Sequence, residues 1–349
     1  MLRIEFHDRE KEIREIRSIL NADPILITFI YGPINSGKTE LINHLARNLP
    51  TEYRVFYVNL RGRFVKSYEE FLDVLFEIDE EKKIENAKKY AEAALADLSK
   101  IVSGIPIPTN LFEKMFEKRE RSKDAFKYIE NFFVEITKKY IPVLIIDELQ
   151  VIGDIKVDDL LIYKLFNFFV RLTKELHLAH VFAITSDSLF IEEVFSEAML
   201  QGRSEYLLVD DFDKETAMEF LSKYNFKEEE KSKVWYYCGG KPVCLLKIIN
   251  VKLNNGNIDE KTNEMFKIRK GQIEEIVYSL EENNKKMFEN MVKVLIEFKN
   301  KDKVNYKYLR EEIKFLVKKN IIFADPVNKE LRTQSTLDLL AIRDVLNEF

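Results

Sequence analysis

The segment GPINSGKT, residues 32–39, has glycines, a lysine and a threonine where a phosphate-binding loop needs them. Gly32 and Gly37 would let backbone N–H groups wrap a phosphate, and the following helix would add its positive amino-terminal end. Lys38 would neutralise the β and γ phosphates, and the hydroxyl of Thr39 would bind Mg²⁺. A chance glycine turn is the alternative, but a strand-like run precedes the segment and a helix-like run follows it. We therefore expect a nucleotide to contact Gly32, Pro33, Ile34, Asn35, Ser36, Gly37, Lys38, Thr39 and Glu40.

Two consecutive acids, Asp147 and Glu148, follow the apolar run VLII and could complete a hydrolytic site. Asp147 would orient Mg²⁺ together with Thr39, and Glu148 would polarise the attacking water. Ligand sites in open α/β sheets lie at the carboxyl ends of the strands, where these acids would stand. A solvated acidic turn is the simpler alternative. We favour the catalytic interpretation because the same chain carries a candidate phosphate loop.

Two further polar positions could act on a γ-phosphate. Thr185 or Ser186, in the segment FAITSDS, could contact that phosphate or hold the attacking water. A hydroxyl that only caps the next helix explains these residues almost as well. Arg203 lies before the last strand-like run and could reach a γ-phosphate in its own subunit or in a neighbour's. As an isolated surface arginine it would have no such role.

These residues need a sheet to position them, and the apolar runs predict one. Five β-branched runs of strand length cover residues 25–31, 54–60, 141–147, 180–186 and 204–210. A helix capped by Asp8 is expected before the first strand, and another helix after the phosphate loop, which makes a βαβ unit and a parallel sheet. Residues 68–139 are expected to form a helical insertion with a loop at 103–110.

After the fifth run the strand-like pattern stops, and two further parts are expected. We predict a core over residues 1–211, a helical lid over 212–284 and a separate domain over 285–349. The last domain should contain a helix, a second helix at 305–320, a strand–turn–strand at 321–334 and a final helix. That order is typical of a winged helix. The predicted fold class is α/β, a phosphate-loop parallel sheet with a helical lid and a C-terminal winged-helix domain.

Charge bears on the class of partner. The formal net charge of the whole chain is −5, which argues against a polyanion-binding role for the molecule as a whole. Residues 285–349 hold 14 Lys and Arg against 10 Asp and Glu, a net charge of +4 that suits duplex DNA. Glu311 and Glu312 interrupt the basic face of the helix best placed to enter a groove. A protein contact through the same domain is therefore the alternative.

Other compositional features bear on the compartment. Cys238 and Cys244 are too few for a disulfide framework or a metal site, which indicates a reduced, cytoplasmic location. The N-terminus is charged from its third residue and has no signal-peptide core. No run of about 18 apolar residues occurs, so no membrane span is expected.

Five motifs together resemble the archaeal ATPase family within the STAND and AAA+ branch of phosphate-loop proteins. They are FHDREKEI (6–13), GPINSGKT, IDELQ (146–150), the pair Gly202–Arg203 and CGGKP (238–242). The resemblance implies that Asp8 and Arg9 lie against the adenine, and that Pro242 packs near the base or the ribose. It also implies that Arg203 senses the γ-phosphate.

The leading hypothesis is a nucleotide switch that binds ATP or ADP with Mg²⁺ and hydrolyses ATP slowly. Nucleotide would close the lid and move the C-terminal domain, with regulated self-association as a further consequence. The second hypothesis is a nucleotide-dependent DNA-binding regulator or initiator-like factor. The third is a protein-interaction scaffold that holds ADP without turnover.

Overall fold

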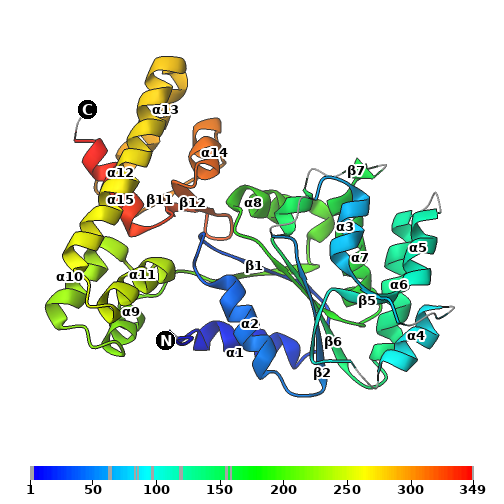
Figure 1. The fold of residues 1–349 in the computed structure, drawn as a ribbon. Coiled ribbons are helices and arrows are strands. Elements are labelled where there is room, and N and C mark those ends of the chain that lie inside the picture. Colours follow the sequence, from blue (N-terminus) through cyan, green and yellow to red (C-terminus); the bar gives the residue numbers. More distant parts are fainter. Residues whose placement is uncertain are drawn as a thin grey trace.

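The structure, a computed structural model, describes residues 4–61, 65–81, 84, 86–95, 98–117, 121–153, 156–157 and 159–347. Its centre is a sheet of six parallel strands in the order β10-β1-β9-β6-β2-β4 (Figure 1). The strands are β1 (Ile27–Tyr31), β2 (Tyr53–Asn59), β4 (Ile101–Ser103), β6 (Ile141–Asp147), β9 (His180–Ile184) and β10 (Ser204–Leu208). Five of these strands confirm the prediction from the apolar runs, and β4 adds an edge strand.

Alternation along the strands divides the apolar side chains between two cores. In β1, Phe29 joins the core on one face of the sheet and Ile30 joins the core on the other. The first face is covered by α3 (Tyr68–Leu75), α6 (Arg121–Ile136) and α7 (Leu161–Val170), and the second by α1 (Glu10–Leu20) and α2 (Lys38–Asn48). The parallel strands therefore end together, in a layer between helices, at one edge of the sheet.

Short elements complete the core around these helices. They are η1 (Leu149–Ile152), β7 (Lys156–Val157), β8 (Asp159–Leu160), η2 (Arg171–Glu175), α8 (Ser188–Ser196) and η3 (Ala198–Leu200). The first helix, α1, begins at Glu10 with Arg9 as its N-cap, so the cap expected at Asp8 lies one residue later. Asp8 and Arg9 both have left-handed backbone angles, with φ of 58° and 72°.

The predicted helical insertion contains strands, so that prediction is wrong in part. The elements present are α3, β3 (Phe76–Asp79), α4 (Ala87–Ala94), β4, β5 (Ile105–Pro108), α5 (Thr109–Glu117) and α6, and residues 82–83, 85, 96–97 and 118–120 lie outside the described residues. The loop expected at 103–110 is instead largely β5, which pairs only with β3. An edge strand tolerates Pro106 and Pro108 because one side of it needs no N–H donors. Gly104 allows the sharp turn into β5 with a φ of 78°.

Between β10 and the C-terminal region the chain is helical, as the sequence predicts. The helices are α9 (Lys214–Ser222), α10 (Glu228–Cys238), α11 (Pro242–Leu253) and α12 (Ile258–Asn283), and α9, α10 and α11 share one apolar core with the start of α12. Gly239 breaks the run between α10 and α11 with a φ of 54°. A β-carbon at Gly240 would lie 1.7 Å from the carbonyl oxygen of Phe212, so only glycine fits there.

The C-terminal region, residues 285–347, combines helices with a small antiparallel sheet. Its elements are α13 (Lys285–Glu297), β11 (Lys303–Asn305), α14 (Glu311–Lys318), β12 (Ile322–Asp325), β13 (Glu330–Thr333) and α15 (Thr336–Val345), with strand order β11-β13-β12. The strand–turn–strand prediction is confirmed. The helix predicted over 305–320 is shorter, because its first residue belongs to β11, which pairs with β13.

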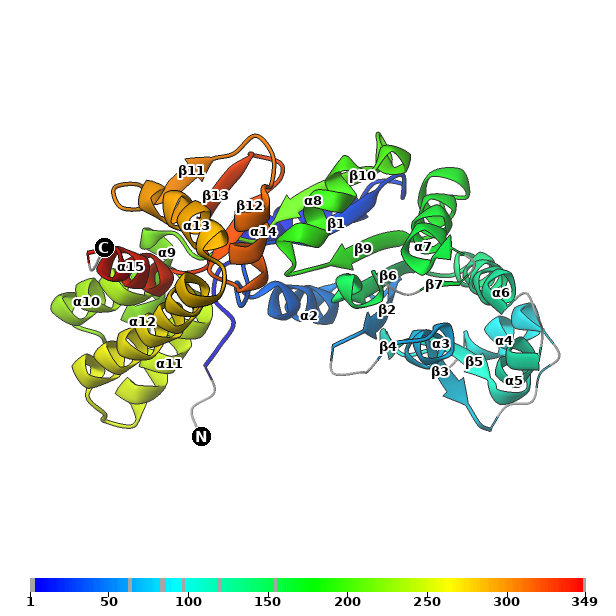
Figure 2. The same ribbon diagram turned by 90° about the horizontal axis from the view of Figure 1, so that it is seen from above.

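The C-terminal region packs back onto the core, beside α8 and the end of β1 (Figure 2). The hydroxyl of Tyr31 donates to the Asp325 carboxylate at 2.9 Å, and the hydroxyl of Tyr306 donates to Glu192 at 2.6 Å. Arg332 forms an ion pair with Asp210. These contacts bring the C-terminal region to the edge of the sheet where the candidate site lies. Within the described residues, no helix is both long and apolar enough to cross a membrane.

Candidate functional site

The candidate phosphate loop connects β1 to α2, as the sequence predicts. Gly37 has a φ of 95° and stands directly before the first residue of α2. Asn35 is also left-handed, with a φ of 61°. A β-carbon at Gly32 would lie 2.2 Å from the carbonyl oxygen of Val209, so only glycine lets the loop leave the sheet there. The loop therefore has the wrapped backbone that a phosphate requires.

Lys38 is buried inside this loop. Its side chain is 4% exposed, and its ammonium donates to the carbonyl oxygens of Gly32 at 3.0 Å and Pro33 at 2.8 Å. Burial, helped by the positive charge of Lys241, lowers the pKa of Lys38 to about 7. A polyanion at the loop would restore the protonated form. The loop therefore holds a buried, chargeable donor among its own carbonyl oxygens.

Asp147 ends β6 beside Thr39, as predicted for a metal site. The Thr39 hydroxyl donates to the Asp147 carboxylate at 2.9 Å, and the Tyr57 hydroxyl donates to the same oxygen at 2.6 Å. Burial and the Asp147 charge raise the pKa of Tyr57, so its hydroxyl stays protonated and donates. A hydroxyl and a carboxylate fit Mg²⁺, which takes one or two protein oxygens and completes its shell with phosphate and water. Bound there, Mg²⁺ would neutralise phosphate charge.

Glu148 follows in a left-handed backbone conformation, with a φ of 62°. It forms an ion pair with Arg61, and the Gln150 amide donates to its other oxygen at 2.6 Å. The Thr185 hydroxyl in turn donates to the side-chain amide oxygen of Gln150 at 2.8 Å. The structure thus brings Glu148 and Thr185 together, with Gln150 between them. The backbone N–H of Asp187 also donates to the Thr185 hydroxyl, but the N-cap of α8 is Asp187, so the helix-capping alternative is not supported for Thr185.

Asp8 and Arg9 stand directly before α1, and their side chains make different contacts. The Arg9 guanidinium donates to the carbonyl oxygen of Ser36 at 2.5 Å and lies 4.6 Å from the centre of the Phe212 ring. Arg9 is 5% exposed, whereas Asp8 is exposed and accepts from the Thr216 hydroxyl at 3.3 Å. Arg9 is therefore joined directly to the loop, and Asp8 is joined to α9.

Pro242 begins α11, and its neighbour Lys241 is the residue that touches the loop. The Lys241 ammonium donates to the carbonyl oxygen of Ile34 at 3.0 Å and pairs with Asp211 at 3.0 Å. Burial raises the pKa of Asp211, and Lys241 opposes that shift. The turn between α10 and α11 therefore ties the helical region to the phosphate loop.

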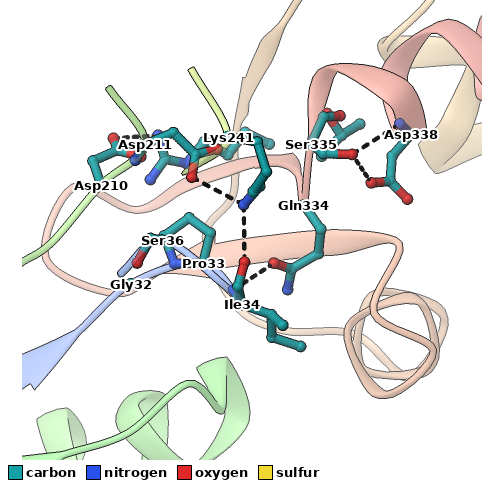
Figure 3. A network of polar contacts seen from close by, with 12 residues as sticks. Gly32, Pro33, Ile34, Ser36, Asp210, Asp211, Lys241, Gln334, Ser335 and Asp338 are labelled. Atoms are coloured by element: carbon teal, nitrogen blue, oxygen red, sulfur yellow. Dashed lines mark hydrogen bonds and ion pairs between the residues drawn. The ribbon is translucent and has the colours of Figure 1, made fainter. Parts of the chain in front are cut away.

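The C-terminal region contacts the same loop residue from another direction. The side-chain oxygen of Gln334 accepts from the backbone N–H of Ile34 at 3.1 Å, and its amide donates to the carbonyl oxygen of Ile322 at 3.3 Å. Figure 3 shows Lys241 and Gln334 meeting the two polar atoms of the Ile34 backbone. Three parts of the chain thus converge on the tip of one loop.

Arg203 is not brought to the loop in its own chain. Its carbonyl oxygen accepts from the N–H of Ile27, at the amino end of β1, and its guanidinium donates to Met199. The phosphate loop starts five residues later, about 16 Å along an extended strand. An arginine side chain does not span that distance, so the expected contact within one subunit is not supported.

Four residues that line or brace this site were not predicted from the sequence. Lys241 lies inside the CGGKP motif, and a buried lysine next to a phosphate loop could have been considered there. Tyr57, Arg61 and Gln334 carry no local signal, because only the pairing of distant strands brings them close.

The fold and site together define a class of protein, the phosphate-loop ATPase fold on a parallel sheet. Residues 6–248 match the family described as "ATPase domain predominantly from Archaea". Residues 259–346 match the family described as "Uncharacterized ATP-binding protein MJ1010-like, C-terminal domain". The chain therefore belongs to this mainly archaeal family of ATPase domains, which confirms the resemblance found in its motifs.

Relatives match the chain over almost its whole length. It is 48% identical to "Uncharacterized ATP-binding protein MJ1659" of Methanocaldococcus jannaschii, over 99% of this chain and 98% of that protein. It is 46% identical to "Uncharacterized ATP-binding protein PYRAB09480" of Pyrococcus abyssi, over 98% and 99% respectively. Among solved structures, the Walker-type ATPase PABY2304 of Pyrococcus abyssi has the same fold. Its TM-score is 0.65 at 17% identity, with 97% of this chain and 96% of that chain covered.

Proposed function

We propose that the protein is an ATP-binding, Mg²⁺-dependent ATPase that acts as a nucleotide switch. The family and the names of the relatives support ATP as the nucleotide. Lys38 and the loop backbone would hold the phosphates, and Thr39 and Asp147 would hold Mg²⁺. Glu148 would accept the proton of the attacking water. Gln150 and Thr185 would position Glu148 and that water.

The observation that carries the switch is the double contact on Ile34. A phosphate at the loop would compete for the N–H that Gln334 now occupies. Losing that contact would change how the C-terminal region is held at the loop. The contact of Lys241 with the Ile34 carbonyl oxygen would couple the helical region to the same change. Nucleotide binding and the positions of two other parts of the chain are thereby linked.

Replacing Gln334 with alanine should raise nucleotide affinity about fivefold, because one net hydrogen bond of roughly 1 kcal/mol no longer competes. Fluorescent-nucleotide titration measures this change, with Gln201→Ala as the control, since Gln201 is exposed beyond η3. Hydrogen exchange in α15 should also rise in the unliganded variant. A fall in affinity would show that Gln334 supports the nucleotide instead of competing with it.

Nucleotide affinity should fall as the pH rises above 7. Lys38 has a pKa of about 7 before binding, and phosphates raise that pKa, so binding above pH 7 takes up a proton. The expected loss is up to about tenfold for each pH unit between 7.5 and 9. In Lys241→Met the fall should begin at a higher pH, because one cause of the lowered pKa is gone. A flat profile in the parent protein would contradict the role of Lys38.

A nucleotide-dependent DNA-binding regulator is the second candidate. The strand–turn–strand after α14 and the net charge of +4, from 14 basic and 10 acidic residues in 285–349, support it. However, α14 packs against α8 of the core. It would have to separate from α8 before it could enter a DNA groove. Mobility shift of duplex DNA at low salt, with and without ATP, separates this candidate from a switch that acts on protein partners.

Two remaining proposals concern turnover and assembly. A scaffold that holds ADP without turnover would bind nucleotide tightly and release no phosphate from ATP.

Arg203 could serve the γ-phosphate only in a neighbouring subunit, which requires nucleotide-dependent self-association. Light scattering with ADP and with an ATP analogue tests that requirement.

A further inference from the structure

A cavity of about 500 Å³ opens beside the tip of the phosphate loop, a size within the range of small-molecule sites. Three segments of the core line it: the loop tip at Ile34 and Asn35, the catalytic side at Arg61, Glu148 and Gln150, and the start of α8 at residues 186–188. The fourth wall comes from the C-terminal region. There, Val317, Lys318, Asn320 and Gln334 face the same space.

Of the two cationic side chains that line this cavity in the described part of the chain, Arg61 and Lys318, only Lys318 has no carboxylate partner. Arg61 is committed to Glu148, and the Asp187 carboxylate accepts from the N–H groups of Leu189 and Phe190 at the start of α8. Lys318 makes no ion pair with any residue that the structure describes. It is the last residue of α14, where the helix C-terminus favours a positive charge. That preference explains a lysine at the end of α14, but it does not explain why this lysine lines the cavity.

We propose that Lys318 contacts the γ-phosphate of ATP within the same chain, and so makes the C-terminal region a sensor of ATP against ADP. The proposal rests on the proposed ATP-binding function and deepens it. The cavity shares Glu148 and the loop tip, so it lies at the end of the nucleotide where the γ-phosphate would stand. Lys318 would then make, within one subunit, the γ-phosphate contact for which Arg203 is too far away.

The neighbouring lysine provides a matched contrast. Lys319 has the same charge and is also exposed, but it lies 5.7 Å from the Phe315 ring and does not line the cavity. A role of α14 in duplex DNA binding would call on both lysines, because phosphate contacts depend mainly on charge. A γ-phosphate contact would call on Lys318 alone.

Binding of ADP and of a non-hydrolysable ATP analogue, each with Mg²⁺, to the full chain tests the proposal by calorimetry. Lys318→Ala should lower the affinity for the ATP analogue about tenfold, the loss expected for one charge-assisted contact. The affinity for ADP should change less than twofold. Lys318→Arg should restore most of the preference for the ATP analogue. Lys319→Ala should leave both affinities unchanged.

Two results would overturn the proposal. One is a Lys318→Ala variant that keeps the parent preference for the ATP analogue. The other is an equal loss for both nucleotides, which would assign Lys318 a general role in holding the loop. In either case the parent protein still binds ATP, so the proposed function survives. A parent protein that binds neither nucleotide would instead overturn both.

Discussion

Replacing Lys38 with alanine is expected to weaken ATP binding by about 100-fold or more. The ammonium is buried in the loop and already donates to two carbonyl oxygens, so it needs little reorganisation to reach phosphates. Each hydrogen bond to a charged group contributes roughly 1.5–3 kcal/mol, and two of them account for that factor. Fluorescent-nucleotide titration with and without Mg²⁺ measures the loss.

The control for Lys38→Ala is Lys319→Ala, which removes the same charge at an exposed position away from the loop. Circular dichroism should show the same helix content in both variants, because the Lys38 ammonium donates to the carbonyl oxygens of Gly32 and Pro33 in the loop. Unchanged ATP affinity in Lys38→Ala would remove the loop from the nucleotide site. A loss of fold in that variant alone would assign Lys38 a structural role.

The parts of the fold that were predictable are those with a local pattern. The run ITFIY is continuously apolar and β-branched, and it is β1; the glycines after it could be placed because the loop chemistry fixes their spacing. The segment IPIP was predicted to be a loop because proline usually marks one, but it forms β5. Its strand depends on pairing with Phe76–Asp79, a contact that no local pattern encodes.

The site divides in the same way. Lys38, Thr39, Asp147 and Glu148 follow from motifs, because the phosphate and the metal dictate which residue types stand at which spacing. The contacts of Gln334 with Ile34 cross 300 positions of the chain, and only the packing of the C-terminal region brings them together. Arg203 shows the converse. The sequence shows that Arg203 comes between the fourth and fifth strands. It does not show that Arg203 lies at the amino end of β1, away from the phosphate loop.

The second large effect concerns turnover. Glu148→Gln is expected to lower the rate of ATP hydrolysis by about 100-fold or more, since a positioned general base contributes roughly 10²–10⁴. The amide keeps the size of the side chain and can accept a hydrogen bond from one of its two present donors, Arg61 or Gln150, but it cannot take a proton from water. ATP affinity should change less than about threefold, because Lys38 and the loop, not Glu148, are the groups proposed to hold the phosphates. Phosphate release under single turnover measures the rate, and equilibrium titration measures the affinity.

Two variants next to Glu148 make the assignment specific. Asp147→Asn should also slow hydrolysis, but its defect should ease at high Mg²⁺, because Asp147 would act through the metal. Arg61→Ala should instead raise the rate, by about fivefold at most, because the exposed ion pair that holds Glu148 is worth no more than about 1 kcal/mol. Parent-like turnover in Glu148→Gln would exclude Glu148 as the base. A slower rate in Arg61→Ala would show that the ion pair aims Glu148 at the water, and an unchanged rate would show that it neither aims nor restrains Glu148.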